Sequence, residues 1–392
     1  MKCEICTLSL ALNNYQQQLS EKIASVRRQF GEFLTDDVVF AAFESPTAHF
    51  RQRAEFRLWH ERDDEGNNTG EVFYAMFSAG QKAGRKTVKK VEQLPIASRR
   101  INALMPDLLA MIQSHPLLVS RLFQIEFLST LNGETLVTLI YHKALDGEWE
   151  KVAKLLEETL AIYIIGRSRK QKIVLSQDFV TETLTVKGRR YRYRQIEGGF
   201  TQPNAVVCQK MLTWASDIAQ FINAQPVEAE RCNDAKDLLE LYCGNGNFTL
   251  PLSRYFRKVL ATEVAKSSVK SARHNIADNA CQNIAIARLS AQELTQAFTG
   301  QRLFKRLQQD DIDVSDYHIS TVFVDPPRAG VDDDTLQLMQ QFEHIIYISC
   351  NPDTLWDNLQ VLKQSHQVVR VALFDQFPYT QHIEMGVWLR LR

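Results

Sequence analysis

One cysteine follows an apolar stretch in a position suited to nucleophilic chemistry. Residues 345–349 are largely apolar and predict a short buried strand, and Cys350 comes next, with Asn351 and Pro352 as a turn signal. In open α/β sheets, ligands bind and chemistry occurs at the carboxyl ends of the strands. A free cysteine is also often a small buried apolar residue. Position alone therefore leaves open both a nucleophile and a core residue at Cys350.

Two carboxylates occupy comparable positions. Asp325 follows the apolar run 321–324, and the two prolines after it stiffen the loop, so the acid could bond a base edge or a cofactor amine. Glu384 begins the last apolar segment, and His382 would face the same side of an extended chain. Either of these two could remove a proton. A plain turn at Asp325 and an exposed carboxylate at Glu384 are the alternatives.

A glycine-containing loop predicts a nucleoside site. Residues 239–248 read LELYCGNGNF, a strand followed by a turn at Gly244 and Gly246 and a helix start. Glu263 follows a second strand about 20 residues later, where an acid can hold ribose hydroxyls. The loop has neither a third glycine nor a P-loop lysine. S-adenosylmethionine, which carries no phosphate, therefore fits better than NAD, although a structural turn with a surface glutamate remains the alternative.

These residues must be positioned by a parallel sheet. From residue 237 onward, short apolar strands alternate with helical patterns, which is typical of an α/β fold with crossover helices. Residues 1–195 instead predict a strand-rich α+β domain without a nucleotide fingerprint. We therefore expect two domains, 1–195 and 196–392, and leave open whether the N-terminal helix packs on the second. The strands expected in the second domain are 237–242, 258–262, 284–289, 321–324 and 345–349, with a closing pair at 368–374 and 386–391.

Composition excludes several protein classes. The chain has 392 residues and no net charge, with 46 basic and 46 acidic side chains. It has no apolar run of membrane-spanning length and no signal-peptide pattern at its start. The seven cysteines are scattered, and the CxxC of Cys3 and Cys6 has no second pair nearby, so we expect neither disulfides nor a metal site. We expect a cytoplasmic monomer without membrane or metal partners.

Basic residues cluster in the first half of the chain. The segments 82–90, 167–172 and 187–194 are rich in Lys and Arg, and Tyr191 and Tyr193 interleave the last. Residues 51–59 alternate like a strand, with Arg51, Arg53 and Arg57 on one face. Such surfaces suit a phosphate backbone with bases stacking nearby. Solvated loops, and an edge strand protected by charge, are the alternatives.

Taken together, these motifs resemble the RNA uracil-C5 methyltransferases. The segments FTQPN (200–204), LELYCGNGNF, ATE (261–263), VDPPRAG (324–330), YISCNP (347–352) and FDQFPYTQHIE (374–384) stand in that family's order. Residues 45–60 and 122–131 are similar to the bacterial tRNA-modifying members, so the resemblance covers nearly the whole chain.

The resemblance implies a fold and a set of roles. It implies a class I, Rossmann-like S-adenosylmethionine methyltransferase domain preceded by an α+β RNA-binding domain. Cys350 matches the family's nucleophile and Glu384 its proton acceptor. The positions that match cofactor-binding residues are Gln202, Tyr242, Asn247, Glu263 and Asp325. Phe123 is our candidate for stacking within a folded RNA loop, and Arg328 for favouring the Cys350 thiolate or contacting RNA.

The implied reaction is methylation of C5 of uridine 54 in the T arm of tRNA, and of the tRNA-like loop of tmRNA. Neither the four-cysteine cluster nor the extra small β-barrel of the ribosomal-RNA members is visible, which favours tRNA. Methylation of 23S rRNA, cytosine-C5 methylation, and a non-catalytic RNA-binding or chaperone role are the rival interpretations.

Overall fold

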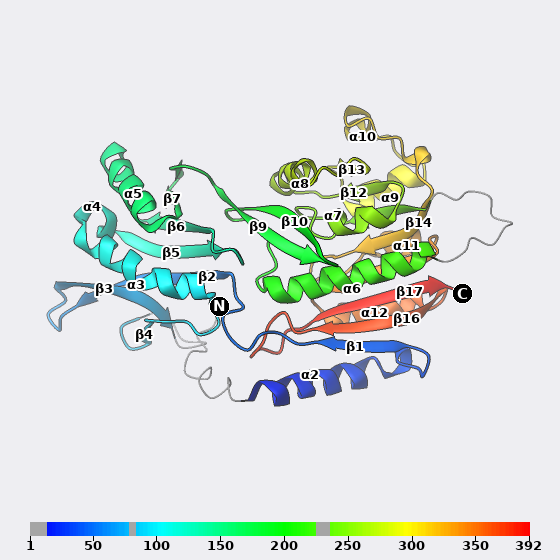
Figure 1. Ribbon diagram of the computed structural model, residues 1–392, viewed down its shortest axis with the longest axis horizontal. Coiled ribbons are helices and arrows are strands. Elements are labelled where there is room, and N and C mark those ends of the chain that lie inside the picture. The colour runs from blue at the N-terminus through cyan, green and yellow to red at the C-terminus, as the bar shows by residue number, and fades with distance from the viewer. Residues whose placement is uncertain (1–13, 78–83, 225–235) are drawn as a thin grey trace. The chain divides into compact units, whose positions relative to one another are not determined.

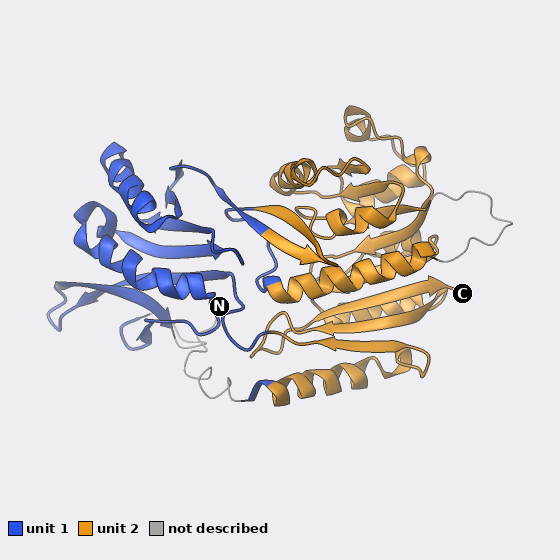
Figure 2. Cartoon of the chain, viewed as in Figure 1, with its two compact units in different colours: residues 1–15, 46–182, 195–205 blue, residues 16–45, 183–194, 206–392 orange. Residues whose placement is uncertain are grey.

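The computed structural model describes residues 14–77, 84–224 and 236–392. The chain divides into two compact units (Figure 2). Unit 1 comprises residues 1–15, 46–182 and 195–205, and unit 2 comprises residues 16–45, 183–194 and 206–392. The Cys3–Cys6 pair considered in the sequence lies outside the described residues.

Unit 1 is built on a seven-stranded sheet with the order β4-β3-β2-β5-β6-β7-β8. Its apolar face forms one core with the helices (Figure 1). In β2 the residues Ala54, Phe56 and Leu58 are buried there, while Arg57 is exposed, which confirms the alternation predicted from the sequence. The strands are β2 (Arg53–Arg62), β3 (Asn68–Phe77), β4 (Val88–Lys90), β5 (Leu122–Ser129), β6 (Thr135–Tyr141), β7 (Tyr163–Ser168) and β8 (Gln171–Val174), and the helices are α3 (Arg99–Ser114), α4 (Pro116–Val119) and α5 (Gly147–Leu160).

Unit 2 contains an eight-stranded sheet with the order β1-β16-β17-β15-β14-β11-β12-β13. The five strands from β15 to β13 run parallel, and β17 is antiparallel to both β15 and β16. This sheet confirms the predicted α/β fold with its closing pair. The strands are β11 (Asp237–Leu241), β12 (Val259–Thr262), β13 (Ile284–Ala287), β14 (Ile319–Val324), β15 (His344–Ser349), β16 (His366–Phe374) and β17 (Glu384–Leu391).

Helices cover this sheet, as crossover connections require. They are α6 (Ala205–Ala224), α7 (Thr249–Leu252), α8 (Lys266–Asp278), α9 (Ala291–Phe298), α10 (Lys305–Gln309), α11 (Asp333–Met339) and α12 (Pro352–Leu362) (Figure 1). Within the described ranges, no helix is both long and apolar enough to cross a membrane. The same ranges contain no group of three His, Cys, Asp or Glu side chains placed to hold a metal ion.

The N-terminal part of the chain contributes two elements to unit 2. Helix α2 (Tyr15–Gln29) belongs to it, and strand β1 (Val39–Phe43) extends the sheet by parallel pairing with β16, from Val39 opposite Arg370 to Phe43 opposite Phe374. The sequence pattern did not predict this strand, because a short VFAAF segment carries no signal of its distant partner. The unit with the catalytic motifs is thus assembled from both ends of the chain.

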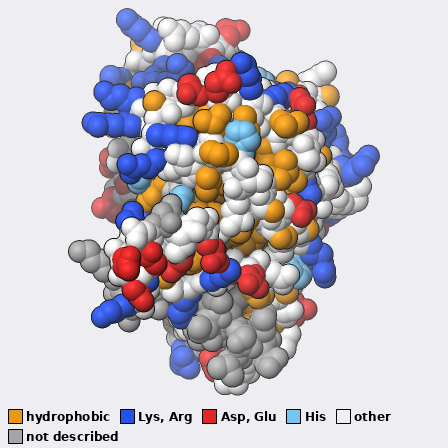
Figure 3. Space-filling model, turned by 90° about the vertical axis from the view of Figure 1, so that its left-hand side faces the viewer, with side chains coloured by type: hydrophobic (Ala, Val, Ile, Leu, Met, Phe, Trp, Pro, Cys, Tyr) orange, Lys and Arg blue, Asp and Glu red, His pale blue; other side chains and the backbone are white. Residues whose placement is uncertain are grey.

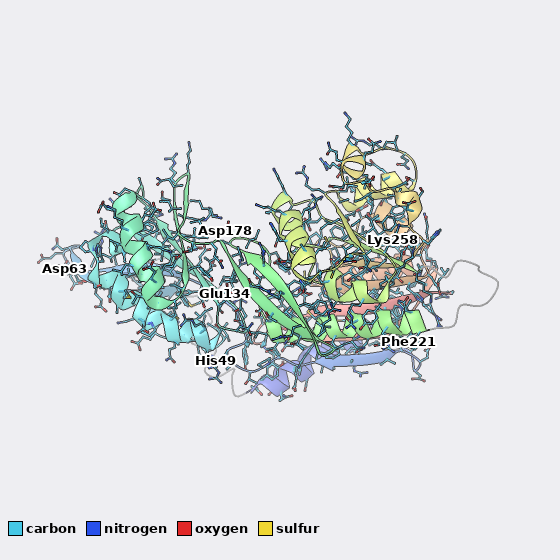
Figure 4. The ribbon with its side chains drawn as sticks, turned by 45° about the horizontal axis from the view of Figure 1, so that its top comes forward. His49, Asp63, Glu134, Asp178, Phe221 and Lys258 are labelled. Carbon is cyan, nitrogen blue, oxygen red and sulfur yellow. The ribbon has the colours of Figure 1, made fainter. Side chains whose placement is uncertain are left out.

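A two-stranded ribbon, β9 (Phe179–Val186) with β10 (Arg189–Ile196), is divided between the units. At its unit 1 end, Glu134 accepts a hydrogen bond from the N–H of Thr181 at 3.0 Å, and Asp178 pairs with Lys172 (Figure 4). In β10, Tyr191 and Tyr193 are buried. The interpretation of these tyrosines as RNA-stacking residues is therefore wrong, because a buried ring has no face left for a base.

Candidate active site

Strand pairing brings Cys350 and Glu384 together. In the antiparallel pair β15–β17, the last residues in register are Ser349 and Met385. Cys350 and Glu384 are the next residues along the two strands, so the same register places them opposite each other. The negative charge of Glu384 acts on the Cys350 thiol, which agrees with this proximity. The candidate nucleophile and the candidate base therefore meet at one edge of the sheet.

Asp325 joins this pair from the neighbouring strand. Val324, the last residue of β14, pairs with Tyr347 of β15, and Asp325 follows directly. On its other side Val324 pairs with Leu241 of β11, so Tyr242 stands beside Asp325 in the next position. The charge of Asp325 acts on both Cys350 and Glu384. Three groups singled out in the sequence, and Tyr242 beside them, thus share the carboxyl edge of the parallel strands.

Hydrogen bonds hold the two catalytic loops against each other. The Asn351 side chain donates to the carbonyl of Arg328 at 2.9 Å, which ties the loop after Cys350 to the loop after Asp325. Asn358 of α12 accepts from the N–H of Val331 at 3.1 Å. Asn351 also caps α12, accepting from the N–H of Asp353 at 3.2 Å. The turn predicted at Asn351 is therefore a helix cap that also fixes the spacing of the two loops.

The Cys350 thiol is protonated at neutral pH in this state of the chain. Its pKa is raised to about 11, first by burial and then by the charges of Glu384 and Asp325. The positive charge of Arg328 acts in the opposite direction, as proposed from the sequence, but it is outweighed. The thiol therefore needs a further positive charge, or a proton acceptor, to become a nucleophile.

Two buried carboxyls, those of Glu384 and Asp325, act on the thiol, and the charge of Asp325 also acts on a third, that of Glu240. Burial raises the pKa of Glu384 well above its usual range, with Asp325 adding to the effect, and Glu384 is only 4 % exposed. Burial likewise raises the pKa of Asp325 to about 7 and that of Glu240, in β11, to about 8. Sequence reasoning missed Glu240, although a lone acid inside an apolar strand was a visible signal. Perturbed acids gathered at one point are characteristic of active sites.

The loop after β11 has open space beside a fixed carboxylate. Glu263 accepts the N–H of Gly244 on Oε2 at 3.1 Å and the N–H of Ala265 on Oε1 at 2.7 Å, which fixes its carboxylate at the end of β12. Gly244 has φ +58° and Gly246 φ +84°, and a Cβ added at Gly244 would meet no atom within 4 Å. Tyr242 also has a positive φ, a strained conformation for a non-glycine residue. The open side of this loop and the fixed acid suit a ribose.

Asn247 lies farther along the same loop. Its backbone carbonyl accepts the hydroxyl of Tyr193 at 3.0 Å, and its side-chain amide lies 3.5 Å from the sulfur of Cys208 in α6. The side chain is partly exposed. Tyr193 therefore supports the cofactor loop, which is a structural role that sequence reasoning did not anticipate.

The remaining predicted site residues lie in unit 1. Gln202 is on segment 195–205, where the N–H of Gln52 donates to the carbonyl of Pro203 at 2.8 Å. Arg51 is half-buried and donates to the carbonyl of Arg53 at 3.0 Å, while Arg53 donates to the carbonyl of Gly199 at 3.0 Å. Both guanidinium groups thus donate to backbone carbonyls. The cofactor contact predicted for Gln202 and the RNA contacts predicted for Arg51 and Arg53 stay predictions.

The exposed Arg57 stacks on the half-buried ring of Phe123 in unit 1. The Arg57 guanidinium carbon lies 3.9 Å from the centre of the Phe123 ring. Phe123 also stacks on His142, with ring centres 4.1 Å apart and planes 26° from parallel. His142 and Lys143 line a pocket of about 760 Å³ together with Arg169. Sequence reasoning did not single out His142, because its stacking partner Phe123 lies far from it in the chain.

Comparison with known proteins shows the family to which the chain belongs. A family model described as tRNA (Uracil-5-)-methyltransferase matches residues 14–392. The chain is 55 % identical over 377 residues to a tRNA/tmRNA (uracil-C(5))-methyltransferase of Acinetobacter baylyi, which covers 96 % of this chain and 99 % of that protein. It is 55 % identical over 379 residues to a protein of the same description from Neisseria meningitidis, covering 97 % and 99 %.

A solved structure shares the fold. The tRNA (uracil-54, C5)-methyltransferase of Pyrococcus abyssi, in complex with S-adenosyl-L-homocysteine, matches with a TM-score of 0.66 at 18 % identity. The match covers 96 % of this chain and 83 % of that one. At this level of identity the likeness concerns the fold alone.

Proposed function

Because the chain belongs to the tRNA (uracil-5-)-methyltransferase family, we propose that it methylates a tRNA uridine at C5 with Cys350 as the nucleophile and Glu384 as the base. The chain is an S-adenosylmethionine-dependent uracil-C5 methyltransferase. The observation that carries the residue assignment is the β15–β17 register, which sets Cys350 opposite Glu384 at the edge that also holds Asp325.

The thiol activates a ring carbon that is otherwise unreactive. When the Cys350 sulfur bonds to C6 of uracil, the C5=C6 electron pair moves toward the C4 carbonyl and makes C5 nucleophilic. The thiol proton must leave first, and it can pass to the carboxylate of Asp325, which leaves the Glu384 carboxylate free for the later C5 proton. The raised pKa of Asp325 makes it a better proton acceptor than an ordinary carboxylate once it is ionised.

Glu384 completes the reaction. After C5 has gained its methyl group, it still carries the original hydrogen. Removal of this proton by the Glu384 carboxylate restores the C5=C6 double bond and expels the Cys350 sulfur from C6 as a thiolate. Both residues act on adjacent ring carbons, which requires them to stand together as the strand register places them.

The residues at the loop after β11 fit S-adenosylmethionine. We propose that Glu263 holds the ribose hydroxyls, with Tyr242, Asn247 and Asp325 lining the same edge. The open space above Gly244 and the fixed carboxylate of Glu263 support this fit. When bound, S-adenosylmethionine supplies an electrophilic methyl group and the positive charge that the buried acidic site lacks. We further propose that Gln202 contacts the cofactor.

Unit 1 is proposed to bind the RNA. Arg57 offers an exposed cation, and the exposed His142, which stacks on Phe123, offers an aromatic face for an extruded base. The pocket beside His142 includes Lys143 and Arg169, two cations suited to a phosphate. Figure 3 shows one face of the molecule on which Lys and Arg side chains border an area of hydrophobic ones, a combination that suits nucleic acid.

We propose uridine 54 in the T arm of tRNA as the target, and the tRNA-like loop of tmRNA as a second substrate. The names of the relatives support both RNA classes. Such an enzyme would work in the cytoplasm, where these RNAs are matured. Because one chain supplies Cys350, Glu384 and Asp325, we propose that it acts as a monomer.

Two substitutions test the proposed roles. Cys350→Ala should abolish methylation of unmodified tRNA while leaving binding of S-adenosylmethionine intact, since only the covalent step is lost. Glu384→Gln should methylate C5 but fail to release the RNA, so a denaturing gel should show a covalent protein–RNA band. Full turnover by Cys350→Ala would remove the nucleophile assignment, and absence of the band with Glu384→Gln would remove the base assignment.

A further inference from the structure

A buried lysine of the N-terminal helix contacts the loop that leads into Glu384. Lys22 of α2 and its partner Asp375 have 3 % and 0 % of their side-chain surfaces exposed. The Lys22 ammonium donates to Asp375 Oδ1 at 2.7 Å, to the carbonyl of Phe377 at 3.0 Å and to the carbonyl of His382 at 3.1 Å. An ammonium has three N–H groups, so all of its donors are used on this one loop.

The three acceptors are spread along the connection between β16 and β17. Asp375 follows the last residue of β16, and His382 stands two residues before Glu384. Lys22 therefore connects the start of the loop to its end through hydrogen bonds. Within the loop, the Thr380 hydroxyl donates to the carbonyl of Phe377 at 2.8 Å and accepts the N–H of His382 at 3.1 Å.

A second side chain of α2 holds the middle of the loop. Gln18 Oε1 accepts the N–H of Tyr379 at 2.7 Å. Tyr379 has φ +64°, a conformation that non-glycine residues rarely adopt without support from their surroundings. Gln18 and Lys22 are four residues apart and so lie on the same face of the helix. This face of α2 is thus matched to the loop before Glu384.

We propose that Lys22, assisted by Gln18, is a positioning residue that sets Glu384 for removal of the C5 proton. The inference rests on the proposed function, because it takes Glu384 as the base. A buried ion pair by itself is weak evidence for stability, since desolvation offsets much of the attraction. A base, in contrast, must stand within hydrogen-bond reach of its proton, and misplacement by about 1 Å can cost on the order of 100-fold in rate.

The proposal separates two steps of the reaction. Lys22 hydrogen-bonds the loop of Glu384 and not the segment that bears Cys350. Loss of Lys22 should therefore leave attack by Cys350 and methyl transfer largely intact. Proton removal and release of the sulfur should slow, so methylated RNA should remain bonded to the protein. A purely structural role would lower the active fraction without this accumulation.

The experiment compares four variants of the full chain with unmodified tRNA and S-adenosylmethionine. Lys22→Met should lower kcat on the order of 100-fold, leave KM for tRNA within about twofold, and give a covalent band on a denaturing gel. Gln18→Ala should show the same pattern more weakly. Glu384→Gln serves as the positive control for trapping.

Arg257→Met is the matched control. It breaks another ion pair of unit 2, in which the exposed Arg257 donates to the fully buried Asp237 at 2.9 Å, at the opposite end of β11 from the active site. It should lower thermal stability without producing the covalent band. If Lys22→Met fails to fold, the double variant Lys22→Met/Asp375→Asn is measured in its place with the same readouts. This variant removes both charges of the buried pair.

The outcomes distinguish the positioning role of Lys22 from the proposed role of Glu384. A covalent band with Lys22→Met, absent with Arg257→Met, supports the positioning role. Reduced activity of Lys22→Met without a band, while Glu384→Gln does trap RNA, overturns it and leaves the proposed function standing. Failure of Glu384→Gln to trap RNA overturns the proposed assignment of Glu384 as the base, on which the positioning role of Lys22 rests.

Discussion

The ionisation of Cys350 gives a quantitative test of the site's electrostatics. With its pKa at about 11, roughly one thiol in a thousand is ionised at pH 8, against roughly one in four for a cysteine with the ordinary pKa of ~8.5. The more basic thiolate is also the better nucleophile, which recovers roughly tenfold of the difference. Alkylation at pH 8 should therefore be roughly 20-fold slower than that of a free thiol of ordinary pKa.

The assay is alkylation of the full chain with iodoacetamide from pH 7 to pH 10, followed by mass spectrometry of the peptide that contains Cys350. The rate should rise about tenfold per pH unit and reach no plateau by pH 10, since the titration midpoint lies above that pH. Glutathione in the same solutions supplies the reference thiol.

The bound cofactor should change this rate through charge. S-adenosylmethionine carries a positive sulfonium, whereas S-adenosylhomocysteine has the same shape without the charge or the methyl group. At pH 8 the rate should be higher with the former than with the latter, because positive charge favours the thiolate. A plateau below pH 8, or reactivity equal to that of glutathione, would refute the argument that burial suppresses ionisation. Equal rates with the two ligands would refute the role given to the sulfonium charge.

Three further predictions follow from the same structure. Burial raises the pKa of Glu240 to about 8, so the folded chain keeps a proton that the unfolded chain releases above its ordinary pKa of ~4.3, and the contribution of this group to stability is lost as pH rises. In urea unfolding, the free energy of unfolding of Glu240→Gln should therefore rise by roughly 3 kcal/mol relative to that of the parent chain between pH 5 and pH 8. A difference that does not change with pH would contradict this. Arg57→Ala should weaken tRNA binding and reduce the slope of log K against log salt concentration by about one counterion. Arg51→Ala should instead lower the melting temperature, with a smaller change in that slope, because the half-buried Arg51 guanidinium donates to the Arg53 carbonyl. Equal slopes for the two variants would place the RNA elsewhere. Gly244→Ala should weaken S-adenosylmethionine binding in equilibrium dialysis, because its φ of +58° costs a residue with a Cβ about 1–2 kcal/mol and the added methyl enters the open cradle; unchanged affinity would remove the loop from the cofactor site.

The sequence by itself determined the fold class and singled out the candidate catalytic residues. Strand-length apolar runs alternating with helical patterns are local signals, and they were enough to predict the parallel sheet. Because the carboxyl ends of parallel strands meet at one edge, the residues following those runs, Asp325 and Cys350, could be placed together before any coordinates. Motif order was enough to indicate the family.

The tertiary structure decided what depends on distant partners and on burial. Strand β1 joins the catalytic sheet and Lys22 reaches the loop of Glu384, because packing brings together segments more than 300 residues apart. Tyr191 and Tyr193 look like exposed stacking residues in the sequence but are buried. The raised pKa of Cys350 likewise follows from desolvation, which no local pattern encodes. Periodicity and turn residues are properties of neighbours in the chain, whereas contact and solvent exclusion exist only once the chain has folded.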